Sequence, residues 1–156
     1  MNRATNASVV DLTIRLAESS DAHPIASLMG ELGYATRAAE MEMRLELILK
    51  DPRYKTFVAV RGGKICGMIG TFCYHSYEHN NVGGRILALV VTENMRDQGI
   101  GRALVNAAEN DFSERNITRV AVNTRFTRED AHKFYESIGY TRNGFRFVKN
   151  LSAVAD

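Results

Sequence analysis

The sequence predicts a single α/β domain, and three observations support this fold class. A chain of 156 residues with 45% hydrophobic content is one domain of ordinary globular type. Strand-type apolar runs alternate along the chain with stretches whose apolar residues recur at helical spacing. In residues 86–112, one such strand breaks into a glycine-bearing turn and continues at once as a helix.

The elements follow from these two periodicities and from the turn residues between them. Ser20-Asp21 can cap a helix that is entered through Pro24 and closed by Gly33. The pair at positions 62–63, Gly-Gly, predicts a hairpin between two strands. In chain order we expect a strand over residues 12–16, helices over 24–32 and 38–49, strands over 56–61, 64–74 and 85–91, a helix from the glycine turn to about 112, a strand over 120–123, a helix over about 128–137, and a closing strand over 145–148.

The composition argues against several functions. A net charge of +2 is too small to indicate nucleic acid binding, and no apolar run approaches the roughly 18–20 residues that cross a bilayer. Residues 1–10 lack a signal-peptide core and are predicted to be a flexible tail before one domain over residues 11–156. Cys66 and Cys73 have no metal-ligand spacing, and their separation in one strand disfavours a disulfide. A cytoplasmic protein without a metal is therefore expected.

The turn before residue 100 has the features of an anion site. The first turn of a helix has unpaired N–H groups and a partial positive charge, and glycines let a phosphate approach the backbone. Gly99 and Gly101 supply those glycines, with backbone freedom expected to matter at Gly101, and Arg96 and Arg102 flank them. A Walker loop does not occur in the sequence. A dinucleotide fingerprint would need Gly or Ala where Leu104 stands.

Two motifs carry a resemblance to a known family. The string Arg96-x-x-Gly99-x-Gly101 resembles the pyrophosphate-binding signature of the GNAT superfamily of acetyl-CoA-dependent N-acetyltransferases. Alone, a glycine loop that merely turns the chain would be the simpler interpretation. Residues 131–140 resemble the superfamily's Ala-x-x-Phe-Tyr-Glu-x-x-Gly-Phe/Tyr signature, although their apolar stripe alone would make Tyr135 a core residue. With both motifs in order, a catalytic Tyr135 is favoured.

The resemblance covers nearly the whole chain after residue 11. It implies a GNAT-type fold, with a mixed central β-sheet flanked by about four α-helices in the order β-α-α-β-β-β-α-β-α-β. In that fold the strands before and after the pyrophosphate helix splay apart, and main-chain groups of the earlier strand hold the pantetheine arm of acetyl-CoA. The cofactor-binding residues expected from it are Leu89, Val91, Arg96, Asp97, Gln98, Gly99, Ile100, Gly101, Arg102, Asn123 and Arg128.

The resemblance also implies an acyltransferase mechanism. Tyr135 would be the general acid for the leaving thiolate, and a backbone N–H near Val91 would polarise the thioester. Arg128 stands where many members place an asparagine, and Asn123 is a substitute ligand. Arg85 occupies the register at which a catalytic carboxylate is common, so the general base is not identified. Other titratable candidates are His75, Glu78, His79 and Glu93.

The acceptor is predicted to be the primary amine of a small molecule. No acidic cluster marks a site for a polycationic peptide or an aminoglycoside, and the candidate pocket residues are aromatic and neutral-polar. A non-catalytic acyl-CoA-binding or regulatory domain and a peptide or protein N-acetyltransferase stay open as alternatives, and a homodimer is compatible with the sequence. The candidate acceptor residues are Tyr34, Thr36, Tyr77 and His79.

Overall fold

The structure is a computed structural model that describes residues 11–124 and 128–152. It divides into two compact parts, one up to Val122 and one from Asn123 onward. The predicted tail over residues 1–10 lies outside the described residues. In chain order the first part contains β1 (Thr13–Leu16), a 3₁₀ turn (Ser19–Asp21), α2 (Ala22–Leu32), α3 (Ala38–Lys50), β2 (Tyr54–Arg61), β3 (Lys64–Tyr74), β4 (Gly83–Val91), a 3₁₀ turn (Glu93–Met95), α4 (Ile100–Glu114) and β5 (Val120–Val122), and the second part contains α5 (Glu129–Ser137).

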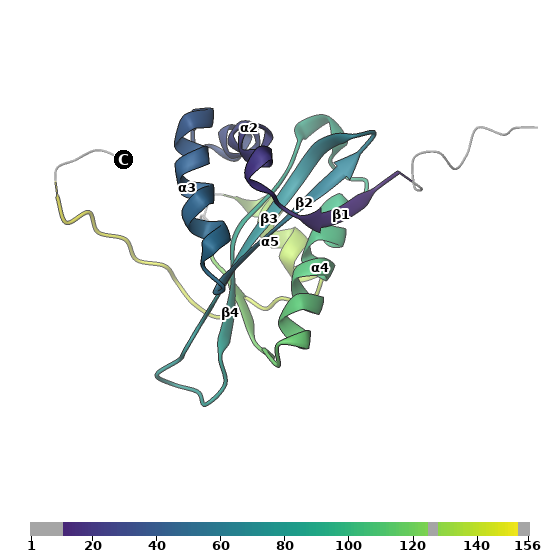
Figure 1. Cartoon of the computed structure of the whole chain (residues 1–156). Coiled ribbons are helices and arrows are strands. Elements are labelled where there is room, and N and C mark those ends of the chain that lie inside the picture. Colours follow the sequence, from purple (N-terminus) through teal and green to yellow (C-terminus); the bar gives the residue numbers. More distant parts are fainter. Residues whose placement is uncertain (1–10, 125–127, 153–156) are drawn as a thin grey trace, which may run out of the picture. The chain divides into compact units, whose positions relative to one another are not determined.

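The first part is built on a mixed sheet of five strands in the order β1-β2-β3-β4-β5. Neighbouring strands from β1 to β4 are antiparallel, and β5 is parallel to β4. The hairpin of β2 and β3 turns at Gly62 and Gly63, which have φ of 57° and 73°, as a tight hairpin turn requires. α4 connects the parallel pair (Figure 1). This arrangement confirms the predicted α/β class, and every predicted element before the closing strand is present within two residues of its expected ends.

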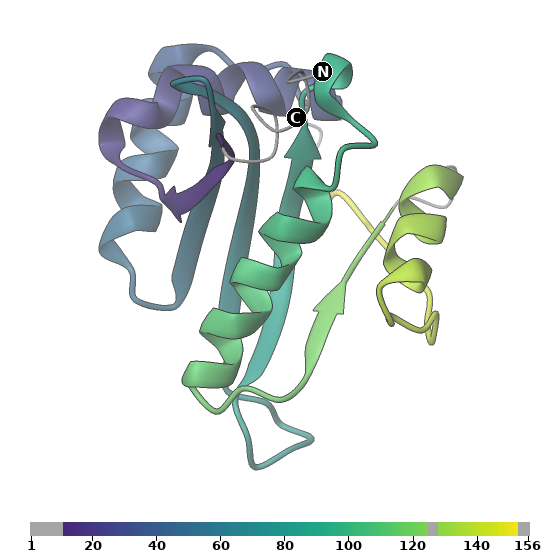
Figure 2. The same ribbon diagram turned by 90° about the vertical axis from the view of Figure 1, so that its right-hand side faces the viewer.

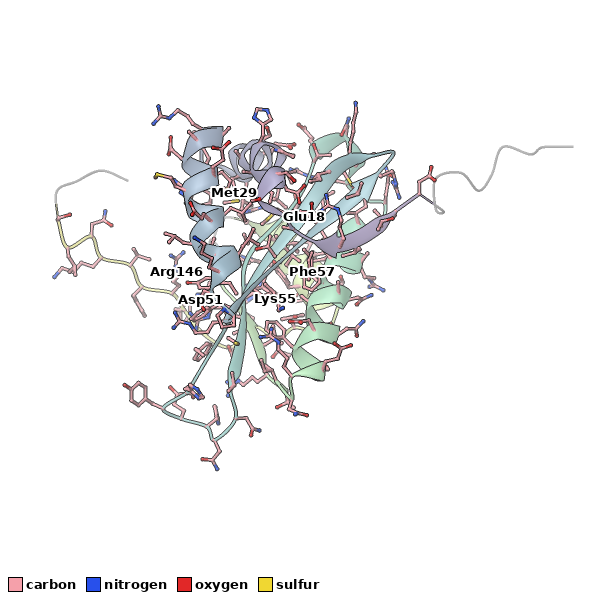
Figure 3. All side chains as sticks on the ribbon, viewed as in Figure 1. Glu18, Met29, Asp51, Lys55, Phe57 and Arg146 are labelled. Carbon is pink, nitrogen blue, oxygen red and sulfur yellow. The ribbon has the colours of Figure 1, made fainter. Side chains whose placement is uncertain are left out.

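Helices cover both faces of this sheet. α2 and α3 pack on one face, where Ile25 and Leu45 meet Val58 in a buried cluster. Met29 of α2 packs against the same cluster, whereas Phe57 precedes Val58 in β2 and so faces the other side of the sheet (Figure 3). α4 crosses that other side (Figure 2). The apolar stripe that α4 buries there consists of Ile100, Leu104, Val105, Ala108 and Phe112.

A buried carboxylate organises the entry to α2. The side chain of Asp21 is 8% exposed and accepts two hydrogen bonds from the guanidinium of Arg15, at 2.8 and 3.0 Å. The N–H of Glu18 donates a third, at 2.8 Å. The hydrogen bonds from Arg15 lower the pKa of Asp21 below its usual value of 3.8, against the opposing effect of burial. The charged form of Asp21 therefore stabilises the turn between β1 and α2.

The second part differs from the prediction at its end. After α5, Gly139 takes a φ of 97° and residues 140–150 form neither helix nor strand. The closing strand predicted over residues 145–148 is therefore wrong. Phe145, Phe147 and Val148 are 87%, 92% and 69% exposed. Alternating apolar residues form a strand only where another strand's edge supplies hydrogen bonds, and a local pattern carries no information about that edge.

None of the described helices is long and apolar enough to cross a membrane. Cys66 and Cys73 are both free thiols, in agreement with the spacing that disfavours a disulfide between them.

Candidate functional site

β4 and β5 separate part of the way along β4. They pair at only three positions, the last of which joins Ile86 to Val122, where β5 ends. The next residue of β4, Leu87, is skipped in the register with β3 and forms a bulge. β4 then continues to Val91. Among the described strands, none pairs with the outer edge of β4 between Leu87 and Val91, and this is the splay that the sequence led us to expect.

The free edge of β4 presents main-chain groups of Leu89 and Val91. Thr92 donates its N–H to the carbonyl of Cys66 in β3 at 2.8 Å. Because main-chain groups of an antiparallel strand alternate between its two sides, Leu89 and Val91 face away from β3. The Nε of Arg96 donates to the Val91 carbonyl at 3.0 Å, which confirms this direction. An extended amide-bearing ligand can pair with such an edge as an added strand once Arg96 releases the carbonyl.

The loop after β4 exposes the start of α4. Gly99 is the N-cap, and no described side chain caps the helix. The N–H of Ala103 is the first to bond back, to the Gly99 carbonyl at 3.0 Å, so the amides of residues 100–102 are available to an anion. Of the predicted loop residues, Arg96, Asp97, Gln98, Gly99 and Arg102 are exposed, Gly101 is half-buried, and Ile100 is buried in the core.

The two glycines of this loop differ in their geometry. Gly99 has a φ of 81°, in the left-handed region that favours glycine. Gly101 lies in the first turn of α4 and has no positive φ. The expectation that Gly101 needs backbone freedom is therefore wrong. A glycine at position 101 would still be favoured because it has no side chain to block the approach of a ligand to the backbone.

Two side chains that the sequence did not indicate hold the ends of this loop. Glu31 of α2 accepts hydrogen bonds from the Thr92 hydroxyl and from the Glu93 N–H, both at 2.9 Å. Arg61, at the end of β2, donates to Oε1 of Gln98 at 2.5 Å. These partners are 61, 62 and 37 positions apart, so no local pattern could have linked them.

A pocket of about 370 Å³ lies near the start of β4, between the β3–β4 loop and β5. Gly84 lies so close to Phe112 of α4 that an added Cβ would come within 2.9 Å of the ring. Because strand residues alternate, the next residue, Arg85, faces the opposite side of the sheet and lines the pocket. Its guanidinium carbon lies 5.4 Å from the centre of the Tyr74 ring.

Arg119 and the β3–β4 loop complete the pocket. Nη1 of Arg119 lies 2.5 Å from Nε2 of His79. Glu78 also lines the pocket, whereas His75 does not. Ser76 orders this part of the loop, because its hydroxyl accepts hydrogen bonds from the N–H groups of Glu78 and His79 at 3.0 and 3.2 Å. Two of the candidate bases therefore lie beside two arginines.

The structure does not bring the four predicted acceptor residues together. Tyr34 and Thr36 lie in the loop between α2 and α3, where the Thr36 hydroxyl donates to the Tyr34 carbonyl at 2.7 Å. That loop follows the last turn of α2, which contacts the end of β4 through Glu31. Tyr77 and His79 lie in the β3–β4 loop, at the opposite end of β4 (Figures 1 and 2). Tyr77 is fully exposed outside the pocket, and His79 lines it.

In the second part, Tyr135 is buried among aromatic rings. The ring centroids of Phe134 and Tyr140 lie 5.3 and 5.6 Å from that of Tyr135, both edge-on. Burial raises the pKa of the Tyr135 hydroxyl to about 12, and the positive charge of Arg128 opposes the shift. The hydroxyl therefore stays protonated and can donate a hydrogen bond near neutral pH. Arg128 and Asn123, the other predicted ligands of this part, are exposed.

Comparison with known proteins places the chain in a family. The model of the acetyltransferase (GNAT) family matches residues 22–140, a span that includes both sequence motifs. The chain belongs to the GNAT acetyltransferase family, and it is an N-acetyltransferase enzyme. Members of this family generally use acetyl-CoA as the acyl donor.

Individual relatives agree with this assignment. The aminoalkylphosphonate N-acetyltransferase of Salmonella typhimurium is 37% identical over 103 residues, which are 66% of this chain and 67% of the relative. An uncharacterized N-acetyltransferase of Bacillus subtilis is 28% identical over 137 residues, which are 85% and 91% of the two chains. The solved structure of a GNAT family acetyltransferase from Staphylococcus aureus has a TM-score of 0.78 and 26% identity, with 90% of this chain and 99% of that chain covered.

Proposed function

We propose that this protein transfers the acetyl group of acetyl-CoA directly to the primary amine of a small molecule, with Tyr135 as the general acid. The observation that carries the proposal is the edge of β4 with which no described strand pairs, and which leads into the exposed start of α4. A strand edge accepts an extended amide-bearing arm and a helix start accepts phosphates, so these two features suit the two halves of coenzyme A. The Salmonella relative is an aminoalkylphosphonate N-acetyltransferase, which supports a small-molecule acceptor.

The donor fits the residues that are present. The amides of residues 100–102 would bind the pyrophosphate together with Arg102 and with Arg96, once Arg96 leaves the Val91 carbonyl. The main-chain groups of Leu89 and Val91 would bind the pantetheine arm. Acetyl-CoA supplies an activated thioester. The remaining proposed contacts are Asp97, Gln98, Gly99, Ile100, Gly101, Asn123 and Arg128.

The amine nitrogen attacks the thioester carbon, the carbon–sulfur bond breaks to release the thiolate of coenzyme A, and the proton that the nitrogen loses passes to solvent. One backbone N–H of the free edge that Leu89 and Val91 form would stabilise charge on the carbonyl oxygen. With a pKa of about 12, Tyr135 is a weaker acid than a free thiol of about 8.5, so it would stabilise the leaving sulfur mainly by donating a hydrogen bond. Arg85 replaces the carboxylate that many members carry on this strand. The amine must therefore arrive in its neutral form.

The test is a panel of acceptors presented to purified protein with acetyl-CoA. Small mono-amines, amino acids, aminoglycosides and lysine-rich peptides are supplied at equal amine concentration, and thiol release is measured together with the mass of the product. We expect acetylation of the small mono-amines. Acetylation confined to the peptides would overturn the proposed acceptor. Binding of coenzyme A without acetylation of any amine would indicate an acyl-CoA-binding role instead.

A further inference from the structure

We propose that the pocket at the start of β4 binds an oxyanion carried by the acceptor, so that the substrate is a small amine with a phosphonate, phosphate or carboxylate group. This inference rests on the proposed function and names the substrate class of the same site. The pocket measures about 370 Å³, enough for a small molecule, and two of its lining residues are Arg85 and Arg119. Guanidinium groups match the planar edge of an oxyanion with paired N–H donors.

The position of Arg85 relates the pocket to the site of transfer. Arg85 lies two residues before Leu87, a separation of about 7 Å along a strand. Leu87 is the bulge beyond which β5 no longer covers β4. The pantetheine arm is assigned to Val91 and Leu89, so its thioester end, remote from the pyrophosphate, lies toward Leu87, and an acceptor whose anion rests on Arg85 holds its amine on that side of the arm. This spacing selects a short amine.

Arg85 is available to a ligand, in contrast to a similar arginine nearby. Arg53 lies over the Phe72 ring at 5.5 Å, much as Arg85 lies over Tyr74, but Arg53 is paired with Asp51 at 2.7 Å. Among the described residues, Arg85 has no carboxylate partner, and its Nε is buried without a hydrogen-bond acceptor. A buried N–H without an acceptor destabilises the protein, so an oxyanion in the pocket would remove that penalty.

Arg119 adds a second positive charge on the same side of the sheet. Arg85 pairs with Ala121 of β5, and Arg119 is two residues before Ala121, so the three side chains share one face. Within the described part of the chain Arg119 has no carboxylate partner, and it contacts His79 instead. Glu78 is the one acid among the described lining residues. Because two guanidinium groups and one carboxylate are among the described lining residues, the pocket carries a net positive charge.

The experiment compares three amines of matched length, 2-aminoethylphosphonate, β-alanine and propylamine. Because the anionic group changes the pKa of the amine, kcat/KM is referred to the concentration of neutral amine. We expect an oxyanion-bearing amine to exceed propylamine by about tenfold or more, the range of one charge-assisted hydrogen bond. The comparison of 2-aminoethylphosphonate with β-alanine shows which oxyanion is preferred. Equal kcat/KM values for all three amines would overturn the inference while leaving the acetyltransferase function intact.

Two substitutions test whether the arginines of the pocket cause this preference for an oxyanion. Arg85→Met keeps an unbranched side chain over Tyr74 and removes the guanidinium, and Arg119→Met does the same beside His79. In each we expect the preference for the oxyanion over propylamine to fall about tenfold. Arg53→Met is the matched control, since it removes a stacked arginine from outside the pocket, and its preference should equal that of the wild type. Thermal unfolding and coenzyme A binding verify that each variant is folded.

A binding measurement separates this inference from the proposed function. Calorimetry with 2-aminoethylphosphonate, in the absence of acetyl-CoA, compares the wild type with Arg85→Met and Arg53→Met. Weaker binding in Arg85→Met alone supports the pocket even if no amine is acetylated, in which case only the proposed function fails. Equal affinity in all three proteins, or an unchanged preference in both pocket variants, would overturn the assignment of the oxyanion to Arg85 and Arg119.

Discussion

Tyr135 combines a packed ring with a buried hydroxyl, and the variant Tyr135→Phe separates the two. If the hydroxyl acts on the leaving sulfur, kcat falls by about 10²–10⁴-fold with acetyl-CoA binding little changed. If Tyr135 is only a core residue, the free energy of unfolding falls by about 1 kcal/mol and turnover survives. Steady-state kinetics and urea unfolding distinguish these results. Tyr140→Phe, which removes a hydroxyl from the neighbouring ring, is the control, and full activity in Tyr135→Phe would end the catalytic assignment.

Substitution of Gly101 tests the proposed pyrophosphate site at the start of α4. Gly101→Val places a branched side chain where a phosphate would meet the first amides of the helix, so affinity for coenzyme A should fall by about tenfold or more. The fold should persist, because Gly101 has helical geometry rather than a positive φ. Calorimetry measures the affinity. Asn106→Val, at an exposed position of the same helix, controls for the branched residue itself. Unchanged affinity in Gly101→Val would remove the pyrophosphate site from this loop.

The turn from β1 into α2 depends on the ionised form of Asp21. Asp21→Asn should lower the free energy of unfolding by about 1–3 kcal/mol at pH 7, because the charge-assisted bonds from Arg15 are lost. The folded-state pKa of Asp21 is lowered, so its stabilisation is fully present above the unfolded value of 3.8 and is lost as the pH falls through the folded value. Urea unfolding at several pH values measures both effects.

The same experiment has a matched control in the Asp51–Arg53 pair, in which Arg53 is exposed to solvent. Asp51→Asn should change the stability less than Asp21→Asn, because solvent screens an exposed pair. A difference between wild type and Asp21→Asn that does not shrink below about pH 3 would show that packing, and not ionisation, carries the contribution of Asp21.

The sequence predicted most of the helices and strands correctly, but it did not predict the end of the chain. The helices and the β2–β3 hairpin were predictable because their signals are local, namely periodicity, caps and the Gly62-Gly63 turn. The closing strand was not predictable, because strand formation depends on a partner edge that residues 145–148 do not find in the described structure. The site shows the same contrast. The loop over residues 96–102 has a local signature, whereas Glu31, Arg61 and Arg119 reach their partners only through the fold.

The raised pKa of Tyr135 affects how the activity depends on pH. A hydroxyl with a pKa of about 12 stays protonated throughout the working range, so its ionisation should cause no loss of activity below about pH 11. With Arg85 in place of a strand carboxylate, kcat/KM should rise with pH as the acceptor amine loses its proton. Initial rates between about pH 6 and pH 10 check this profile. A falling limb in that range that disappears in Tyr135→Phe would contradict the assigned pKa.

The hydrogen bond from Arg61 to Gln98 links two turns that are far apart in the sequence. It ties the loop before α4 to the β2–β3 hairpin, whose turn at Gly62 and Gly63 follows Arg61 directly. Restraint of the loop by the proposed phosphate contact would therefore be transmitted to a glycine turn that has no assigned contact with any ligand. Slower amide hydrogen exchange at that turn would report occupancy of the proposed pyrophosphate site from a distance.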